Sequence, residues 1–149
     1  MQARVLVAVS FGALVLAACA TDSRVAATGE VDPSFYGRWR NVETKIYRAD
    51  GTIAMQPDLQ CVSEVSQSEA ISECSFPSGG KSRVVSRFVS LTATGYELEI
   101  TENDGAPHTV GSRSRVEYRI AGNRRFTTVY PQQSATSPVV KVEATYVRD

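Results

Sequence analysis

Apolar and polar side chains alternate with a period of two residues in four stretches of this sequence. These stretches are 42–46, 96–100, 116–120 and 140–146. Residues two apart lie on the same face of a β-strand, so the alternation predicts strands with one face turned toward a core. Less regular apolar runs predict four further strands, at 60–65, 70–76, 83–91 and 125–130. After Pro33 no window keeps apolar residues at helical spacing, so we expect no amphipathic helix.

Residues that favour tight turns separate these segments. They are Asp50-Gly51, 77–80, Asp104-Gly105 and Gly122-Asn123. The chain therefore has eight predicted strands, or nine if 52–55 forms a strand of its own. The composition agrees, because valine, isoleucine and threonine are abundant and the leucines after Cys19 are only those at 59, 91 and 98. The fold is predicted to be all-β, a small antiparallel barrel or sandwich.

Residues 1–18 have the three parts of a secretory signal peptide. Arg4 supplies a positive charge, 5–16 is an apolar stretch interrupted only by Ser10 and Gly12, and small residues follow. A helix of that length spans about 18 Å, whereas a bilayer core is about 30 Å thick. We therefore expect a removable signal rather than a transmembrane anchor.

The end of this signal, Leu16-Ala17-Ala18-Cys19, resembles the lipobox of bacterial lipoproteins. The resemblance implies cleavage before Cys19, a diacylglycerol thioether on that cysteine and an acylated amino group. Two or more such chains hold a protein firmly at a membrane. Ala20 then favours the outer membrane of the cell envelope, with the domain facing the periplasm. The alternative is an ordinary cleavage site followed by a chance cysteine.

Residues 19–34 contain few large apolar side chains, so we expect a flexible tether there and a folded domain at 35–149. Once Cys19 carries lipid, Cys61 and Cys74 remain as a pair in an oxidising compartment, which predicts a disulfide between neighbouring strands. Closing a loop of about fifteen residues stabilises a fold by roughly 3 kcal/mol. Two free thiols are the alternative. No metal site is expected, because the chain has a single histidine.

The first predicted strand opens with Gly37-Arg38-Trp39, directly after Phe35 and Tyr36. In this position the Gly-x-Trp motif resembles the opening of lipocalin-like, or calycin-type, barrels, and the segment 142–148 is similar to the last strand of small bacterial members. The resemblance implies an antiparallel eight-stranded barrel over 35–149, with the tryptophan closing one end.

In such a barrel the first and last strands are neighbours, since closure leaves no free sheet edge. Trp39 begins the first strand and Arg148 ends the last, so we expect this barrel-closing pair to meet, with the guanidinium over the indole. The alternatives are a solvated Arg148 at the C-terminus and a Trp39 that contacts a ligand.

The sequence lacks the signatures of common enzymes. It has no Gly-x-Ser-x-Gly elbow and no phosphate-binding glycine loop, and a lone His108 near a predicted turn excludes motifs that need two imidazoles. Glu97 and Glu99 alternate with apolar residues, so we expect both to point at water. We therefore predict no catalytic residues and no cofactor. With 16 basic and 16 acidic residues, the chain has no charge excess for binding nucleic acid.

Arginines are concentrated in the C-terminal half of the domain. They are Arg113, Arg115, Arg119, Arg124 and Arg125. One interpretation is a solvated strand face. The other is contact with lipid phosphates, which guanidinium groups bind in a bidentate manner.

The leading functional hypothesis is a non-enzymatic, lipid-anchored envelope protein that binds a small apolar or amphipathic molecule in its barrel. Individual ligand-binding residues do not follow from the sequence. A protein–protein module is the second hypothesis, because some periplasmic protease inhibitors are similar small barrels with Gly-x-Trp, one disulfide and an N-terminal segment that enters the protease cleft. Against it, the N-terminus at Cys19 is expected to be lipidated. The third is a structural envelope component with a filled barrel. No protein partner is identified.

Overall fold

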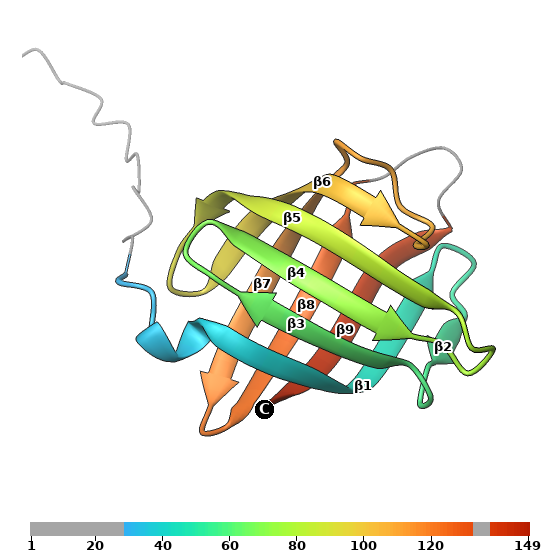
Figure 1. Cartoon of the computed structure of the whole chain (residues 1–149), viewed down its shortest axis with the longest axis horizontal. Helices are drawn as coiled ribbons and strands as arrows, with labels where there is room; N and C mark the ends of the chain where they lie inside the picture. Colours follow the sequence, from blue (N-terminus) through green and yellow to red (C-terminus); the bar gives the residue numbers. More distant parts are fainter. Residues whose placement is uncertain (1–28, 133–137) are drawn as a thin grey trace, which may run out of the picture.

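The computed structural model describes residues 29–132 and 138–149, which form one antiparallel sheet after a short 3₁₀ turn (Figure 1). The turn is η1 (Pro33–Phe35), and it lies at one end of the sheet. The strands are β1 (Gly37–Arg48), β2 (Ile53–Met55), β3 (Gln60–Val65), β4 (Glu69–Ser75), β5 (Lys81–Leu91), β6 (Gly95–Asp104), β7 (Arg113–Ala121), β8 (Arg124–Pro131) and β9 (Val139–Arg148).

Pairing of the first strand with the last closes this sheet into a barrel. Strands β3 to β9 pair in sequence order, and β1 pairs with both β3 and β9, so eight strands form the closed ring. The all-β antiparallel barrel predicted from the sequence is confirmed. In Figure 1, β3, β4 and β5 form the near wall and β7, β8 and β9 the far wall.

The ninth strand, β2, is separate from the ring. It pairs with the second half of β1, at Lys45 to Tyr47, whereas β3 pairs with the first half, at Gly37 to Arg40. The short segment expected near 52–55 is therefore a strand of its own.

A β-bulge in β1 changes which residues face the interior. The pairing with β9 shifts register between Asn41 and Glu43, so Trp39 and Asn41 point inward before the bulge and Thr44 after it. Val42 is 43% exposed, although the alternation in the sequence placed it on the same face as Thr44. The prediction was wrong there because an extra residue in a strand reverses the side-chain alternation.

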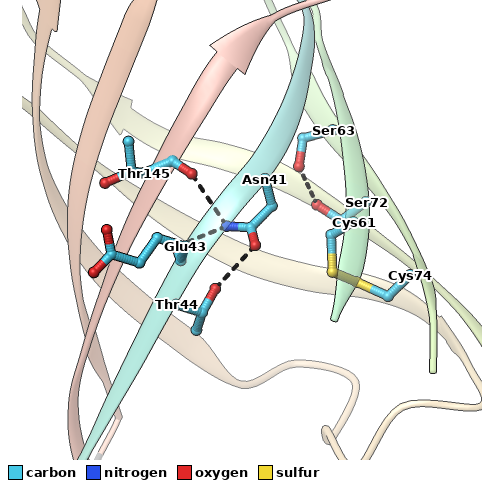
Figure 2. Close-up of a disulfide and its surroundings, with 8 residues drawn as sticks. All are labelled: Asn41, Glu43, Thr44, Cys61, Ser63, Ser72, Cys74 and Thr145. Carbon is cyan, nitrogen blue, oxygen red and sulfur yellow. Dashed lines mark hydrogen bonds between the residues drawn. A yellow bond between two sulfur atoms is a disulfide. The ribbon is translucent and has the colours of Figure 1, made fainter. Parts of the chain in front are cut away.

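Asn41 stabilises this bulge with its own side chain (Figure 2). Its amide nitrogen donates hydrogen bonds to the backbone carbonyls of Glu43, at 3.1 Å, and Thr145, at 3.4 Å, and its oxygen accepts from the Thr44 hydroxyl at 3.1 Å. The carboxamide thus bonds carbonyl groups of both strands where the ladder is interrupted.

The predicted disulfide is present between Cys61 of β3 and Cys74 of β4 (Figure 2). The two cysteines are directly opposite each other in the ladder. Two pairs further along, Ser63 and Ser72 are also opposite each other, and their hydroxyls are 2.9 Å apart. Because paired residues share a face of the sheet, cysteines and serines line the same inner wall.

Large buried side chains gather at one end of the barrel. Phe35 and Trp39 have no exposed surface, and Val65 and Tyr118 pack with them. The Phe35 ring is 4.7 Å from that of Tyr118 and 5.4 Å from that of Tyr96, between ring centroids. Phe35 comes from η1, so the turn that precedes β1 inserts an aromatic plug and closes this end.

Candidate functional site

Trp39 and Arg148 lie directly opposite each other where β1 begins and β9 ends. The Arg148 guanidinium carbon is 4.8 Å from the centroid of the indole ring, which is the arrangement expected for a barrel-closing pair. The indole nitrogen donates to the carbonyl of Phe35 at 3.0 Å. Trp39 thus holds the plug residue with its polar atom and meets a cation with its ring.

Arg148 also fastens η1 to the barrel. Its guanidinium donates to the carbonyls of Ser34 and, at 3.1 Å, Tyr36. Gly37 makes room for this contact, since a Cβ there would lie 3.4 Å from Arg148 Nη1. Gly37 also has a φ of 107°, a conformation that other residues rarely adopt. The Gly-x-Trp motif is therefore required by backbone geometry as well as by packing.

A second arginine, Arg125 of β8, lies inside the same end of the barrel with only 3% of its surface exposed. Its guanidinium carbon is 4.9 Å from the Trp39 ring centroid, 4.7 Å from that of Tyr146 and 5.8 Å from that of Phe35. Its Nε and Nη1 atoms are buried and have no hydrogen-bond partner among the described residues. Arg125 is thus enclosed by aromatic rings without the hydrogen bonds that a guanidinium ordinarily makes.

The charges around Arg125 do not neutralise it. The groups close enough to affect it are the hydroxyls of Tyr96, Tyr118 and Tyr146 and a second cation, Arg148; in the described part of the chain no carboxylate is among them. Burial lowers the pKa of Arg125, but a guanidinium stays charged at neutral pH. Contact with a ring contributes about 0.5–2 kcal/mol, whereas an uncompensated buried charge costs several kcal/mol. In the barrel without a bound molecule, this side chain therefore lowers the free energy of unfolding.

The tyrosines beside Arg125 are held in their neutral form. Burial raises the pKa of Tyr96, and it also raises the pKa of Tyr146 and Tyr118. The Tyr118 hydroxyl donates to the carbonyl of Thr92 at 3.0 Å. Neutral phenols carry hydroxyl donors, so this end of the interior combines one cation with several donor groups.

The remainder of the interior is unusually polar for a small domain. The buried polar residues besides Arg125 are Asn41, Thr44, Ser63, Ser82, Ser86 and Thr127. Each faces the barrel axis, as the cross-strand pairs of Ser63 with Ser72 and Ser86 with Ala70 illustrate. Serine, threonine and alanine side chains are small, so the middle of the barrel is not packed with the large aliphatic groups that usually fill a core.

Inward-facing aliphatic residues toward the opposite end are less buried than the aromatic cluster. Ile46 pairs with Val142, and Val142 with Val129, so these three side chains share the inner face. All are only half-buried, whereas Val116, paired with Val129 from the other side, has 2% of its surface exposed. Along β1, β8 and β9, burial is thus lower at this end than beside the Phe35 plug.

The larger surface hollow, of about 520 Å³, lies outside the barrel. It is lined in part by Glu97, Arg115 and Glu117, which face away from the interior, and Arg115 and Glu117 form an exposed ion pair at 3.1 Å. Glu99 bonds Arg87 and Arg113, each at 2.9 Å, and these hydrogen bonds lower its pKa. Glu97 and Glu99 point away from the interior, as the alternation predicted.

The arginines that were expected together do not share one environment. Arg119 lies over the Phe126 ring at 3.9 Å and Arg115 over Tyr130 at 4.5 Å, both on the outer face. Arg125, by contrast, points inward. The signal was present in the sequence, because Arg125, Thr127 and Val129 are spaced two apart on one face of β8. An arginine at an inward position is rare, so neither interpretation of the arginines in the sequence places one inside the barrel.

The single histidine takes no part in this interior. His108 is exposed in the loop between β6 and β7. Cys19 and the signal at 1–18 lie outside the described residues. Within the ranges 29–132 and 138–149, no cluster of three or more histidine, cysteine or acidic side chains is arranged to hold a metal, and no helix is long and apolar enough to cross a membrane.

The sequence was compared with family models and with curated proteins. No family model matches the sequence, and no curated protein is significantly similar to it. The observations that support the candidate site are therefore the contacts and the burial of side chains inside the barrel.

Replacement of Arg148 tests the closed end. Arg148→Ala removes the contact with the indole and the bonds to η1, so we expect the free energy of unfolding to fall by about 1–3 kcal/mol. The emission of Trp39, the only tryptophan, should shift to longer wavelength as water reaches the ring. Arg40→Ala is the matched control, because Arg40 is exposed on β1, the strand of Trp39, and forms a surface ion pair with Asp149. Unchanged stability and emission in Arg148→Ala would disprove the pairing.

The buried tyrosines predict a loss of stability at alkaline pH. Burial keeps Tyr96 and Tyr146 protonated in the folded state, whereas in the unfolded chain they ionise near their ordinary pKa of 10.0. The unfolded state therefore binds fewer protons above pH 10, and stability falls by about 1.4 kcal/mol per pH unit for each such tyrosine. Below pH 10 this contribution is fully present. Urea unfolding between pH 9 and 12 measures how the free energy of unfolding changes with pH. In Tyr96→Phe this dependence should be weaker, because one of the two ionising tyrosines is missing. An identical slope in both proteins would contradict the assignment.

Proposed function

We propose that the protein is a lipid-anchored protein of the bacterial cell envelope whose barrel binds a small amphipathic molecule. The observation that carries the proposal is the polarity of the interior, where buried hydroxyl and amide side chains take the place of a large aliphatic core. Arg125 extends this polarity to the plugged end. No catalytic role is assigned to any of these residues.

A binding role accounts for a feature that folding alone does not. Burying polar groups is unfavourable unless each is hydrogen-bonded, and an apolar interior of the same size gives a more stable barrel. An eight-stranded barrel has an interior just wide enough to be filled by side chains or to hold one small ligand. Small side chains such as Ser63, Ser82 and Ser86 favour the second use.

The direction of burial supports entry at the end away from the plug. Phe35 and Trp39 are fully buried at the closed end, whereas Ile46, Val129 and Val142 are half-buried toward the other. A molecule that enters there meets aliphatic side chains first and polar groups deeper in the barrel. This order suits a ligand with an apolar tail and a polar head.

Native mass spectrometry of the full chain purified from cells in non-ionic detergent tests the binding role. We expect a mass above that of the covalent protein, and the denaturing spectrum of the same sample supplies the covalent mass, including any lipid. The difference is the mass of a non-covalently bound small molecule. Masses that agree for the native and denatured protein would favour the filled-barrel alternative.

A pair of variants locates the bound molecule. Ser86 of β5 faces the interior of the barrel, and the next residue, Arg87, is exposed on the outer face. Ser86→Leu should fill the space and abolish the additional mass, whereas Arg87→Leu should retain it. Near-UV circular dichroism confirms that both remain folded. Retention of the molecule by Ser86→Leu would place it outside the barrel.

Lipid anchoring is tested at Cys19. Cys19→Ser removes the thiol that receives the diacylglycerol, so we expect either an uncleaved precursor or a folded domain released from the membrane. Immunoblotting of membrane and soluble fractions distinguishes processed from unprocessed chain. Cys61→Ser with Cys74→Ser is the control, because it removes the other two cysteines without touching the signal. Normal processing and membrane retention of Cys19→Ser would refute the anchor.

A further inference from the structure

The guanidinium of Arg125 has unused hydrogen-bonding capacity inside the barrel. Its Nε and Nη1 atoms are buried and make no hydrogen bond among residues 29–132 and 138–149, while its neighbour Arg148 donates to two carbonyls of the plug segment. All other buried side-chain nitrogen and oxygen atoms of the described residues have a partner or some solvent contact. Arg125 is thus the exception in an interior that is otherwise satisfied.

The surroundings of Arg125 favour an anion. Tyr96 and Tyr146 supply neutral phenols, Arg148 supplies a second positive charge, and none of the described carboxylates is among the groups that affect Arg125. Trp39 and Tyr146 pack their rings against the guanidinium, which holds the side chain in place without using its N–H groups. A cation held in this way is pre-organised for a carboxylate or phosphate, to which a guanidinium donates two parallel bonds.

The position of Arg125 on its strand connects it with the rest of the interior. Thr127, the next inward residue of β8, is buried and lies beside Ala144 of β9 toward the middle of the barrel. Half-buried Val129 and Val142 follow along the same face. A chain of apolar groups that lies along these aliphatic residues would bring a terminal head group to Arg125.

We propose that Arg125 is the head-group site of the barrel and that the bound molecule is an anion, with a carboxylate or phosphate group paired to this guanidinium. The inference rests on the proposed function and specifies the class of ligand. The anion pairs with one fork of the guanidinium, Nε with Nη2 or Nη1 with Nη2, and so supplies an acceptor to one of the two unpartnered nitrogens. It also compensates the charge that the fold leaves buried. Trp39 remains a structural plug whose ring supports the guanidinium from one side.

Binding of two matched probes tests the charge requirement. Sodium octanoate and octan-1-ol have the same chain length and differ in the charged head, and a non-ionic detergent contributes no competing anion. By titration calorimetry on the full chain, we expect octanoate to bind about 10- to 100-fold more tightly than octanol, which is the range for a charge-assisted hydrogen-bonded pair. Equal affinities would overturn the anion site while leaving the barrel a binder of neutral amphiphiles. Failure of both probes to bind would count against the proposed function itself.

Variants of two adjacent arginines assign the effect to one side chain. Arg125→Met should remove the preference for octanoate and leave octanol binding unchanged. Arg124→Met is the matched control, because Arg124 is the preceding residue of β8, is exposed and carries the same charge. Arg125→Lys should retain part of the preference, since it keeps the charge and loses the paired donors. Octanoate binding by Arg125→Met at wild-type affinity would disprove the assignment. The comparison of the two probes on the wild-type protein needs no variant, so the proposal stays testable if Arg125→Met does not fold.

Inorganic phosphate distinguishes the head group of an amphiphile from a free anion. If the ligand is amphipathic, phosphate alone should compete weakly with octanoate, and the competition should be lost in Arg125→Met. Phosphate that binds as tightly as octanoate would show that the site takes a small free anion and that the tail contributes nothing. That outcome would support the anion site and contradict an amphipathic ligand.

Discussion

Hydrogen bonds between β1 and β9 run from Trp39–Arg148 to Arg48–Val139 and leave the ring of eight strands without a free edge. This closure defines an inside and an outside, so that every strand residue must face either solvent or the axis. It also brings the two ends of the domain together, because β1 begins where β9 ends. The contacts among Trp39, Arg148 and η1 exist only because of this pairing.

Closure has a geometric cost that the sequence meets at Asn41. A barrel strand must bend and twist to meet both neighbours, and β1 does so through a bulge at Val42. The Asn41 carboxamide bonds carbonyls at the interruption, and after the bulge Thr44, rather than Glu43, is the next inward residue. The disulfide and the Ser63–Ser72 pair lie on the inner wall formed by β3 and β4. The side chains on this part of the wall are therefore small and polar.

The interior is divided into two regions with different energetic roles. The plug of Phe35, Trp39 and Tyr118 supplies the large buried apolar surface that stabilises the domain. Polar side chains beyond the plug, and Arg125 beside it, replace the apolar groups that would add stability. A protein that retains a buried, unpaired cation beside its own hydrophobic plug gives up stability at that position, and such departures from the best packing concentrate at functional sites.

The sequence by itself determined the strand content, the order of the segments and the pair of cysteines. Alternation with period two, turn residues and the scarcity of leucine follow from local chain geometry, which needs no knowledge of the remainder of the fold. The sequence also indicated that Trp39 and Arg148 would meet. In a closed antiparallel barrel the first and last strands are neighbours, and these residues begin the one and end the other.

Only the tertiary structure decided where β1 changes phase, at the bulge that turns Val42 outward, and what surrounds Arg125. Both depend on which face of a strand is turned inward, and one inserted residue or one misjudged face reverses that assignment without changing the local pattern. Arg125 lies beside exposed Arg124 in the sequence and differs from it in a single respect, the side of β8 from which it projects. Neighbouring strands set that side, and through it they decide whether an arginine is a surface charge or a buried cation.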